Sequence, residues 1–568
     1  MDKGTILYKG VPFDGETIID GDVLQRSLIG KSIDEKVAYL QSLQGFFSAI
    51  LFNEDEAILF VDHARSFPLY YSVLDGKLLI ADDPVMIYEP KRDEFSVISA
   101  LEFLCLGYVT GKGTLIKNIK QVEAGKCIIF RNRKIESVVH SLFQPCIKGT
   151  ISPEIFHSSF LESLASSFSR LKAFSRGREL VLPLSGGYDS RLIALCLREL
   201  DFSKVITFSY GRPGNKDSEI SKRVAEALGF DWFFIPYSNE MWRKVAKSES
   251  WSEFQSIAFQ FSSIPHLQDF PAIEFLCKEK VIGPGAVVIP GHRPPGAKPN
   301  NLPVKGGMVS MQDLVDSIIS FHFNLWTYPR GSALDSLFRL RLVEQLGGKS
   351  SIPLIEALCL RGRWFHNERS SKFIVHSVRC YEHFGLRWWL PLLDKGFLSF
   401  WEKMHLSCRQ SECYFRSIGQ ITKDLLGDVN FGVAGWKDRM GYGLSPALRI
   451  KNSNSFIKTS LKSLMNQILR KLGQKELFER IVYEVGYIRK REYEDSNHSF
   501  FAFVDKRDFM ATFTGKENIN SFLALALLRG LIRPECLDER EKEYFKCIKI
   551  FKSDMLAYMT RSFQLKPS

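Results

Sequence analysis

One six-residue stretch, Ser185-Gly-Gly-Tyr-Asp-Ser190, constrains the fold of this chain more than any other. It directly follows the apolar run 180–184 and precedes a helical pattern over 191–200. A strand that breaks at two glycines and restarts as a helix brings backbone N–H groups and the positive end of the helix dipole to one point. The stretch therefore predicts a strand–loop–helix unit whose loop binds phosphate.

The side chains of this loop fit the same prediction. Ser185 and Ser190 add hydroxyl donors, and the carboxylate of Asp189 could hold Mg²⁺ on polyphosphate oxygens. The loop is not a Walker P-loop, because the lysine of that motif is absent. An ordinary glycine-rich turn is the alternative, and the surrounding strand and helix patterns argue against it.

The pattern after the loop predicts an α/β domain. Apolar runs at 204–210, 232–236 and 286–289 read as strands, and residues 217–228 read as a helix between the first two. Strands that alternate with helices at this spacing form a parallel sheet with right-handed crossovers. We therefore expect a parallel sheet with helices on both faces.

The N-terminal quarter has a different pattern, of short alternating apolar runs. Four of them are residues 46–52, 57–61, 69–73 and 77–81, and Asp75-Gly76 between the last two is a strong hairpin signal. A helix is expected over 97–106, and strands resume over 121–130. The pattern predicts a β-rich domain.

Length and composition bound the remaining possibilities. A chain of 568 residues exceeds one typical domain, and we expect a β-rich domain over 1–145, a nucleotide-binding domain over 154–450 and a helical extension over 451–568. No apolar run is long enough to span a membrane. Eleven cysteines lie without C-x-x-C pairs, and the first residues lack an apolar signal core, so reduced thiols and a cytoplasmic location are expected.

The charge balance says little about partners. Lysine and arginine number 76 against 64 acidic residues, a net charge of +12 that suits anionic partners such as ATP, an acidic carrier or RNA. Solvated helix faces explain the basic clusters more simply, so a nucleic-acid surface is not expected.

Two parts of the chain together resemble the asparagine synthetase family. Leu43-Gln-Gly-Phe-Phe47, Asp62-His-Ala-Arg65 and Pro68-Leu-Tyr-Tyr71 are similar to its glutaminase domain. The loop at 185–190 is similar to the pyrophosphate loop of the ATP pyrophosphatase superfamily, and residues 381–394 resemble a later family segment. The resemblance implies an α/β protein: an Ntn-type, β-rich α+β sandwich, then an adenine-nucleotide α hydrolase-like parallel sheet, then a helical C-terminal extension.

The resemblance also assigns site residues. The residues that bind the phosphates of ATP would be Leu184, Ser185, Gly186, Gly187, Asp189 and Ser190. The adenine and ribose pocket would be lined by Phe208, Tyr210 and Gly291. Asp189 would bind Mg²⁺. The residues acting on the reacting groups would be His292, Glu382, Lys437 and Arg439.

Three departures from the family limit what is carried over. Met1 and Asp2 stand where the glutaminase has its N-terminal cysteine, and the first cysteine is Cys105, so glutamine hydrolysis is not expected. This is similar to the β-lactam synthetase and lasso-peptide cyclase branch, whose nucleophile is an amine on the substrate. Pro295 stands at a metal-carboxylate position, so either Asp189 holds Mg²⁺ alone, or another carboxylate substitutes, or adenylation is weak.

The third departure is Arg439, which stands at the position of a family lysine. Its pKa above ~12 keeps it charged but prevents it from shuttling a proton, and Lys437 is the substitute. His292 falls where the family places a glutamate or tyrosine. It is either a general base near neutral pH or a loop histidine without chemistry. Glu382 either assists proton removal or orients the segment that follows it.

The expected function is that of an ATP-dependent amide-forming ligase. It would adenylate a carboxylate on a small molecule, a sugar acid or a peptide, release pyrophosphate, and pass the acyl group to ammonia or a substrate amine. A homodimer is left open. The alternatives are a degenerate homologue that binds nucleotide or serves as a scaffold, and a tRNA-modifying enzyme of the same superfamily.

Overall fold

A computed structural model describes residues 5–144, 152–294, 302–404, 412–432, 519–528, 531 and 537–548 of the chain. Pro295, Lys437, Arg439 and most of the expected extension over 451–568 lie outside the described residues.

Residues 5–144 contain two antiparallel sheets. In chain order their strands are β1 (Thr5–Asp14), β2 (Thr17–Ile18), β3 (Gln44–Phe52), β4 (Glu56–Val61), β5 (Tyr70–Leu74), β6 (Lys77–Ala81), β7 (Lys120–Gln121), β8 (Lys126–Arg131) and β9 (Lys134–Val139). The larger sheet has the order β2-β1-β3-β4-β8-β9 and the smaller one the order β6-β5-β7. The β-rich pattern of the sequence is confirmed.

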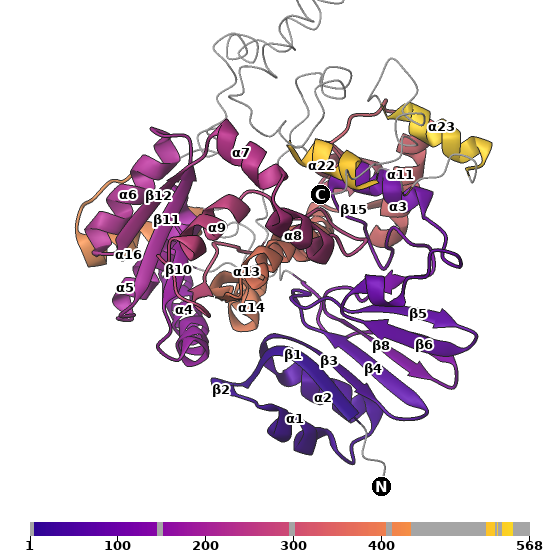
Figure 1. The fold of residues 1–568 in the computed structure, drawn as a ribbon, viewed down its shortest axis with the longest axis horizontal. Coiled ribbons are helices and arrows are strands. Elements are labelled where there is room, and N and C mark those ends of the chain that lie inside the picture. Colours follow the sequence, from indigo (N-terminus) through magenta and orange to yellow (C-terminus); the bar gives the residue numbers. More distant parts are fainter. Residues whose placement is uncertain are drawn as a thin grey trace, which may run out of the picture.

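Apolar side chains on both faces of the larger sheet explain the layering. On one face, helices α1 (Gly21–Leu28) and α2 (Ile33–Ser42) bury Leu24 and Leu40 against Phe47 and Phe60. On the other face, Leu59 belongs to a cluster that includes Tyr71 of the smaller sheet. The domain is thus a sandwich of two sheets with a helical layer on the outside (Figure 1).

The hairpin and the helix predicted in this domain form as expected. Asp75 and Gly76 have φ angles of 51° and 73°, the left-handed conformation that a two-residue type I′ turn requires. Helix α3 spans Val97–Leu106 and ends at Gly107, whose φ of 84° lets the chain leave the helix. A short 3₁₀ turn, η1 (Pro84–Ile87), lies between them.

The second domain is built on a five-stranded parallel sheet, as the sequence predicts. Its strands are β10 (Leu180–Pro183), β11 (Val205–Gly211), β12 (Asp231–Pro236), β13 (Val287–Val288) and β16 (Arg387–Trp388). Their order is β12-β11-β10-β13-β16, so the chain winds outward from β10 in one direction and then in the other. Ligands of such sheets bind beyond the carboxyl ends of the strands where this reversal occurs, here between β10 and β13.

Helices pack along this sheet. They are α4 (Pro153–Ser175), α5 (Tyr188–Glu199), α6 (Lys216–Leu228), α7 (Asn239–Ala246), α8 (Glu249–Phe259), α9 (Phe270–Lys278), α13 (Arg379–His383), η4 (Pro391–Leu393), α14 (Lys395–Lys403) and α16 (Glu412–Leu426). Figure 1 shows α5, α6 and α16 on one side of the sheet and α9 on the other. Residues 188–190 form the first turn of α5, so the loop leads directly into a helix.

The connection from β13 to β16 carries additional elements. They are β14 (Met308–Ser310), α10 (Met311–His322), α11 (Ala333–Leu346), β15 (Ser351–Pro353), α12 (Leu354–Phe365), a π-helical segment (His366–Ile374) and η3 (Val375–Val378). Two described helices of the C-terminal region, α22 (Ile519–Leu528) and α23 (Glu539–Cys547), lie beside α3 and α11 (Figure 1). The indole N–H of Trp326 donates to the carbonyl of Ser521 at 2.8 Å, which ties α22 to this layer.

The two sheet domains share a core. The ring of Trp389, just after β16, lies 5.6 Å from Phe13 and 4.9 Å from Phe46 of the N-terminal domain, between ring centroids. An imidazole N–H of His63 donates to the carbonyl of Leu393 at 2.8 Å. Aromatic packing and buried hydrogen bonds therefore join the domains directly.

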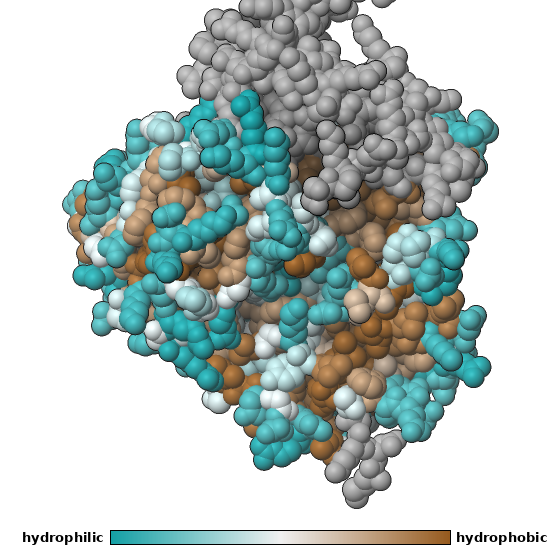
Figure 2. Space-filling model, in the orientation of Figure 1, coloured by the Kyte–Doolittle hydropathy of each residue, from teal (hydrophilic) through white to brown (hydrophobic). Residues whose placement is uncertain are grey.

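The surface differs between the two halves. Figure 2 shows apolar residues gathered over the strands of the N-terminal domain, whereas the helices around α5 and α6 present mostly polar residues. Among the described residues, no helix has both the length and the apolar character to cross a membrane.

Candidate phosphate-binding site

The loop after β10 binds much of its own backbone. The N–H of Ser185 donates to the hydroxyl of Ser190 at 3.0 Å, and the N–H of Gly187 donates to the hydroxyl of Ser185 at 3.3 Å. The N–H of Gly186 donates at 2.9 Å to a carboxylate oxygen of Asp217, on the first turn of α6. The two serines therefore shape the loop instead of pointing their hydroxyls freely at a ligand.

Backbone N–H groups without a side-chain cap follow the loop, at the start of α5. Gly187 is the N-cap residue, and no side chain caps the helix. The first N–H groups of a helix have no partner within it. The N–H groups of residues 188–190 therefore supply the anion-binding end of this unit, reinforced by the helix dipole.

The segment after β13 closes against this turn. A Cβ atom on Gly291 would lie 3.1 Å from the backbone nitrogen of Ser190 and 3.5 Å from its Cα. A side chain at this position would crowd the first turn of α5, and the backbone of Ser190 would have to move by a few tenths of an ångström to admit it. The structure thus brings Gly291 to the phosphate loop, where the sequence predicts a pocket residue.

Asp189 projects from the first turn of α5 and is fully engaged. The Nε atom of Arg293 lies 3.1 Å from each of its oxygens, and the hydroxyl of Tyr414, on α16, donates to Oδ1 at 2.8 Å. Arg293 also lies over the ring of Tyr414, 5.7 Å from the centroid. Sequence analysis identified neither partner, because an arginine in a loop and a tyrosine 225 residues away carry no motif.

These contacts bear on the expected Mg²⁺ ligand. The carboxylate of Asp189 is paired with the guanidinium of Arg293 and accepts a hydrogen bond from Tyr414. In this arrangement the described residues do not fit a magnesium site. A cation would have to displace Arg293 to reach Asp189.

Two predicted pocket residues belong to the core of the sheet. The side chain of Phe208 is 0% exposed, and that of Leu184 is 2% exposed. The N–H of Leu184 donates to the carbonyl of Phe208 at 2.9 Å, and its own carbonyl accepts from the hydroxyl of Ser209 at 2.7 Å. In the structure these two residues hold β10 and β11 together and orient the loop.

Tyr210, at the end of β11, leads to a buried carboxylate. Its hydroxyl donates to Asp269 at 2.6 Å, and the hydroxyl of Tyr381 donates to the other carboxylate oxygen at 2.6 Å. His266 lies 3.5 Å from the same carboxylate. Burial alone would raise the pKa of Asp269, but His266 and the two hydroxyls outweigh it and lower the pKa below the usual range.

Sequence analysis assigned Tyr210 to the nucleotide pocket but did not connect it with Asp269, Tyr381 or His266. Asp269 precedes a helix that begins with Phe270-Pro271, which reads as an ordinary helix start. Its tyrosine partners lie 59 and 112 residues away in the chain. Only the sheet order brings these segments together.

His292 and Glu382 have the following surroundings. Burial lowers the pKa of His292 to about 4, with Asp269 opposing, so its imidazole is neutral at pH 7. Its Nδ1 atom is buried and has no partner among the described residues. Both oxygens of Glu382 are engaged, one by Arg379 at 2.8 Å and one by the indole of Trp388 at 2.8 Å.

The described cysteines offer no exposed nucleophile in the N-terminal domain. Cys105 and Cys127 are buried, and burial raises the pKa of each thiol, that of Cys127 to about 11. All eight described cysteines are free.

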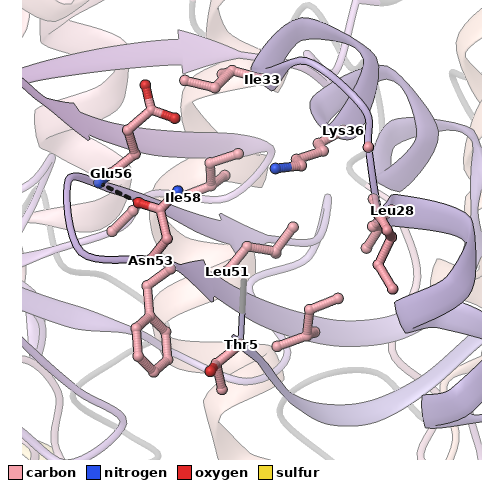
Figure 3. A pocket seen from close by; sticks show the side chains of 13 residues that line it. Thr5, Leu28, Ile33, Lys36, Leu51, Asn53, Glu56 and Ile58 are labelled. Carbon is pink, nitrogen blue, oxygen red and sulfur yellow. Dashed lines mark hydrogen bonds between the residues drawn. The ribbon is translucent and has the colours of Figure 1, made fainter. Parts of the chain in front are cut away.

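A hollow of about 50 Å³ lies apart from the loop, in the N-terminal domain (Figure 3). Leu28 and Ile33, at the α1–α2 connection, face Leu51 and Ile58 of the sheet. Figure 3 shows the ammonium group of Lys36 directed into this hollow. Its small volume and mostly aliphatic walls give it no role in phosphate binding.

Comparison with known proteins gives one match over the site. Residues 169–246 match the family model for asparagine synthase. This stretch extends from α4 through β10, the loop, α5, β11, α6 and β12 to the end of α7. The match therefore covers the loop and Asp217, and it ends before Gly291 and Arg293. Among curated proteins, none matches the chain.

Two solved structures show only distant similarity. Glutamine phosphoribosylpyrophosphate amidotransferase from B. subtilis, complexed with ADP and GMP, is 14% identical over 52% of this chain and 63% of its own, with a TM-score of 0.17. A structure described as the allosteric regulatory enzyme of purine biosynthesis is 15% identical over 41% of this chain and 45% of its own, also with a TM-score of 0.17. The chain thus spans less than two thirds of either, and such scores establish no shared fold.

Proposed function

We propose that this protein is an ATP-dependent amide-forming ligase that uses no glutamine. The observation that carries the proposal is the open N-terminal turn of α5 at the reversal of the parallel sheet, with Gly291 closed against it. Such a turn is suited to phosphate, and the crevice beside it is where sheets of this kind bind their ligands.

The family match supports the nucleotide and the reaction class. Asparagine synthase is the family whose model covers residues 169–246, and this suggests ATP-dependent amide ligation. The matched stretch contains the whole strand–loop–helix unit. The proposal therefore rests on a site whose sequence and geometry agree.

The proposed reaction has two steps. An oxygen of the substrate carboxylate attacks the α-phosphorus of ATP, the bond from this phosphorus to the bridging oxygen breaks, and pyrophosphate leaves. The nitrogen of ammonia or a substrate amine then attacks the acyl carbon, AMP leaves, and the amine loses a proton. Residues 188–190 would bind the charged phosphate oxygens through their N–H groups and hold the groups in line.

The residues near the acyl group would act by orientation more than by strong basicity. A base whose pKa is about 4 draws a proton weakly at neutral pH, so His292 is proposed to line the site as a neutral group and not to act as the general base. Glu382 is proposed to orient the segment around Trp388. Lys437 and Arg439 remain proposed contacts of the α-phosphate.

The nitrogen source follows from the thiols. Glutamine hydrolysis of the family's type needs an accessible cysteine with a free amine beside it. Cys105 and Cys127 are buried with raised thiol pKa values. We therefore expect free ammonia or an amine on the substrate to be the acceptor, and no glutamate to be released from glutamine.

ATP–pyrophosphate exchange with a panel of carboxylates tests the function. Exchange that depends on one carboxylate supports the ligase, and Asp189→Ala should lower it by about tenfold or more, because Arg293 loses the carboxylate that positions it, while the circular dichroism spectrum stays unchanged. Glu199→Ala is the matched control, since Glu199 is an exposed acid at the far end of the same helix. Wild-type exchange by Asp189→Ala would contradict the assignment of the site.

One observation favours a second function, that of a nucleotide-binding protein without adenylation. Asp189 forms an ion pair with Arg293, and Asp217 accepts a hydrogen bond from the N–H of Gly186. Two groups of the loop that could bind a nucleotide complex therefore already have protein partners. ATP binding by calorimetry without exchange for any carboxylate or amine would favour this function.

A further inference from the structure

Arg293 holds the position in which a metal ion would balance Asp189. Its Nε atom lies 3.1 Å from both carboxylate oxygens, so it bridges them as a cation would. Tyr414 fixes the carboxylate from the other side at 2.8 Å. The acid has therefore no unengaged oxygen toward which a metal ion could be drawn.

The backbone around Gly291 also places Arg293 beside the phosphate loop. It follows Gly291 by two residues, and a Cβ atom on Gly291 would lie 3.1 Å from the backbone nitrogen of Ser190. The Nη1 atom of Arg293 donates to the carbonyl of Pro294 at 3.1 Å, which fixes the plane of the guanidinium. Its Nη2 atom has no partner among the described residues, so a charged donor is left beside the open turn of α5.

The charges around the loop make a cation from Arg293 necessary. A guanidinium on Asp189 leaves no net charge, where a divalent cation would leave one positive charge, and Asp217 adds a negative charge at Gly186. Arg191, two residues further along α5, offsets that negative charge: it is 5% exposed, and its Nη2 atom lies 2.8 Å from the carbonyl of Gly432 and 3.5 Å from that of Gly186. Its Nε atom is buried and has no partner among the described residues.

From this geometry we propose that Arg293 replaces a divalent metal in this site: it balances Asp189 and donates to the phosphates of the nucleotide. The inference rests on the proposed function only in taking the bound anion to be a nucleotide polyphosphate. Arginine suits the task because its planar group can bind a carboxylate and a phosphate at once and never loses its proton.

The test measures ATP binding to the full chain by isothermal titration calorimetry, once with Mg²⁺ and once with EDTA. We expect the wild-type Kd in EDTA to lie within about threefold of that in Mg²⁺, because metal supplies no essential contact. This comparison needs no variant. A loss of tenfold or more in EDTA, on the order of 1.4 kcal/mol, would overturn the inference and leave nucleotide binding standing.

Variants locate the effect. Arg293→Ala should weaken binding in EDTA by about tenfold or more, the worth of a charge-assisted hydrogen bond, and Mg²⁺ should restore part of it because Asp189 is then released. Arg198→Ala, an exposed arginine at the far end of α5, is the control and should bind as the wild type does. Unchanged binding by Arg293→Ala in EDTA would overturn the inference.

A third outcome separates the inference from the function. If the wild type binds ATP in neither buffer, the proposed function fails together with this inference. If it binds in both buffers but catalyses no exchange, the inference stands and only the ligase reaction is contradicted.

Discussion

Gly291 and Ser190 are held so close that a single methyl group would separate them. A Cβ atom on Gly291 would meet the backbone nitrogen of Ser190 at 3.1 Å. Backbone cannot yield as a flexible side chain can, so Gly291→Ala should push the first turn of α5 away from the strand end. We expect nucleotide binding to weaken by about tenfold or more, on the order of 1.4 kcal/mol, measured by calorimetry.

Gly283→Ala is the matched control for this substitution. Gly283 precedes β13, it does not have a positive φ angle, and a Cβ atom there would meet nothing within 4 Å. Its binding should equal that of the wild type. Equal affinity of Gly291→Ala and Gly283→Ala would show that the contact with Ser190 does not shape the site.

Asp217 should weaken nucleotide binding in the wild type. Its carboxylate accepts the N–H of Gly186 at 2.9 Å and places a negative charge beside the phosphate loop. Asp217→Asn keeps an acceptor oxygen and removes the charge, so affinity for ATP should rise by about fivefold, on the order of 1 kcal/mol. Glu219→Gln, an exposed acid on the same turn of α6, should have a smaller effect. A loss of affinity in Asp217→Asn would mean that the carboxylate has a structural role in the loop.

Removal of one partner from the buried ion pair of Arg170 and Asp394 should strongly destabilise the second domain. Its side chains are 4% and 0% exposed, and two hydrogen bonds of 2.8 Å and 2.5 Å join them. Asp394→Asn leaves the guanidinium buried without its counterion, so the free energy of unfolding in urea should fall by roughly 3–5 kcal/mol.

An exposed pair provides the comparison for this prediction. Glu240 and Lys244 lie 2.9 Å apart with more than three quarters of each side chain in solvent. Glu240→Gln should change the free energy of unfolding by less than about 0.5 kcal/mol. If the free energy of unfolding fell by a similar amount in both variants, burial of the Arg170–Asp394 pair would not be the reason for its effect on stability.

Acid should destabilise the protein through buried neutral histidines. Burial lowers the pKa of His140 and of His366 to about 4 from 6.5. An imidazole N–H of each donates to a backbone carbonyl at 2.9 Å, and the Nδ1 atom is buried with no partner among the described residues. The unfolded chain binds more protons than the folded one between these pKa values. Stability is therefore full above pH 6.5 and falls as the pH decreases toward 4.

The size of this effect is about 3 kcal/mol for each histidine across the whole range. Urea unfolding at pH 7.5 and at pH 5 should show about 2 kcal/mol of it for each histidine, because pH 5 lies about 1.5 units below the unfolded pKa of 6.5. His366→Gln keeps an N–H donor for the carbonyl of His63 and cannot titrate, so its loss of stability between the two pH values should be smaller. A profile that is the same in this variant and the wild type would show that His366 does not contribute.

The fold was predictable where local chemistry and tertiary packing agree. The Asp75-Gly76 turn, the helix at Val97–Leu106 and the parallel strands β10 to β13 all follow from patterns that span a few residues. The segment before residue 43 was not resolved by such patterns. Strand β1 is partly exposed along most of its length, so its alternation is weak, and its pairing with β3 decides its structure.

The site was predictable only in part, for a geometric reason. Ser185 to Ser190 lie in one local unit, and strand–loop–helix chemistry identifies them. Arg293 and Tyr414 reach Asp189 from a second strand end and a distant helix. Asp269 meets Tyr210 and Tyr381 in the same way. Contacts between sequence-distant segments have no local periodicity, and the side chains that complete the loop were therefore invisible to pattern analysis.

The aromatic packing of Trp389 decides what becomes of a shortened chain. Its ring contacts Phe13 and Phe46 from one domain and Phe174 from the other. A chain that begins at α4 would expose this indole to water and invite aggregation. The N-terminal domain is therefore needed to complete the hydrophobic core, whatever chemistry it carries. In the full chain the two domains should unfold in a single thermal transition.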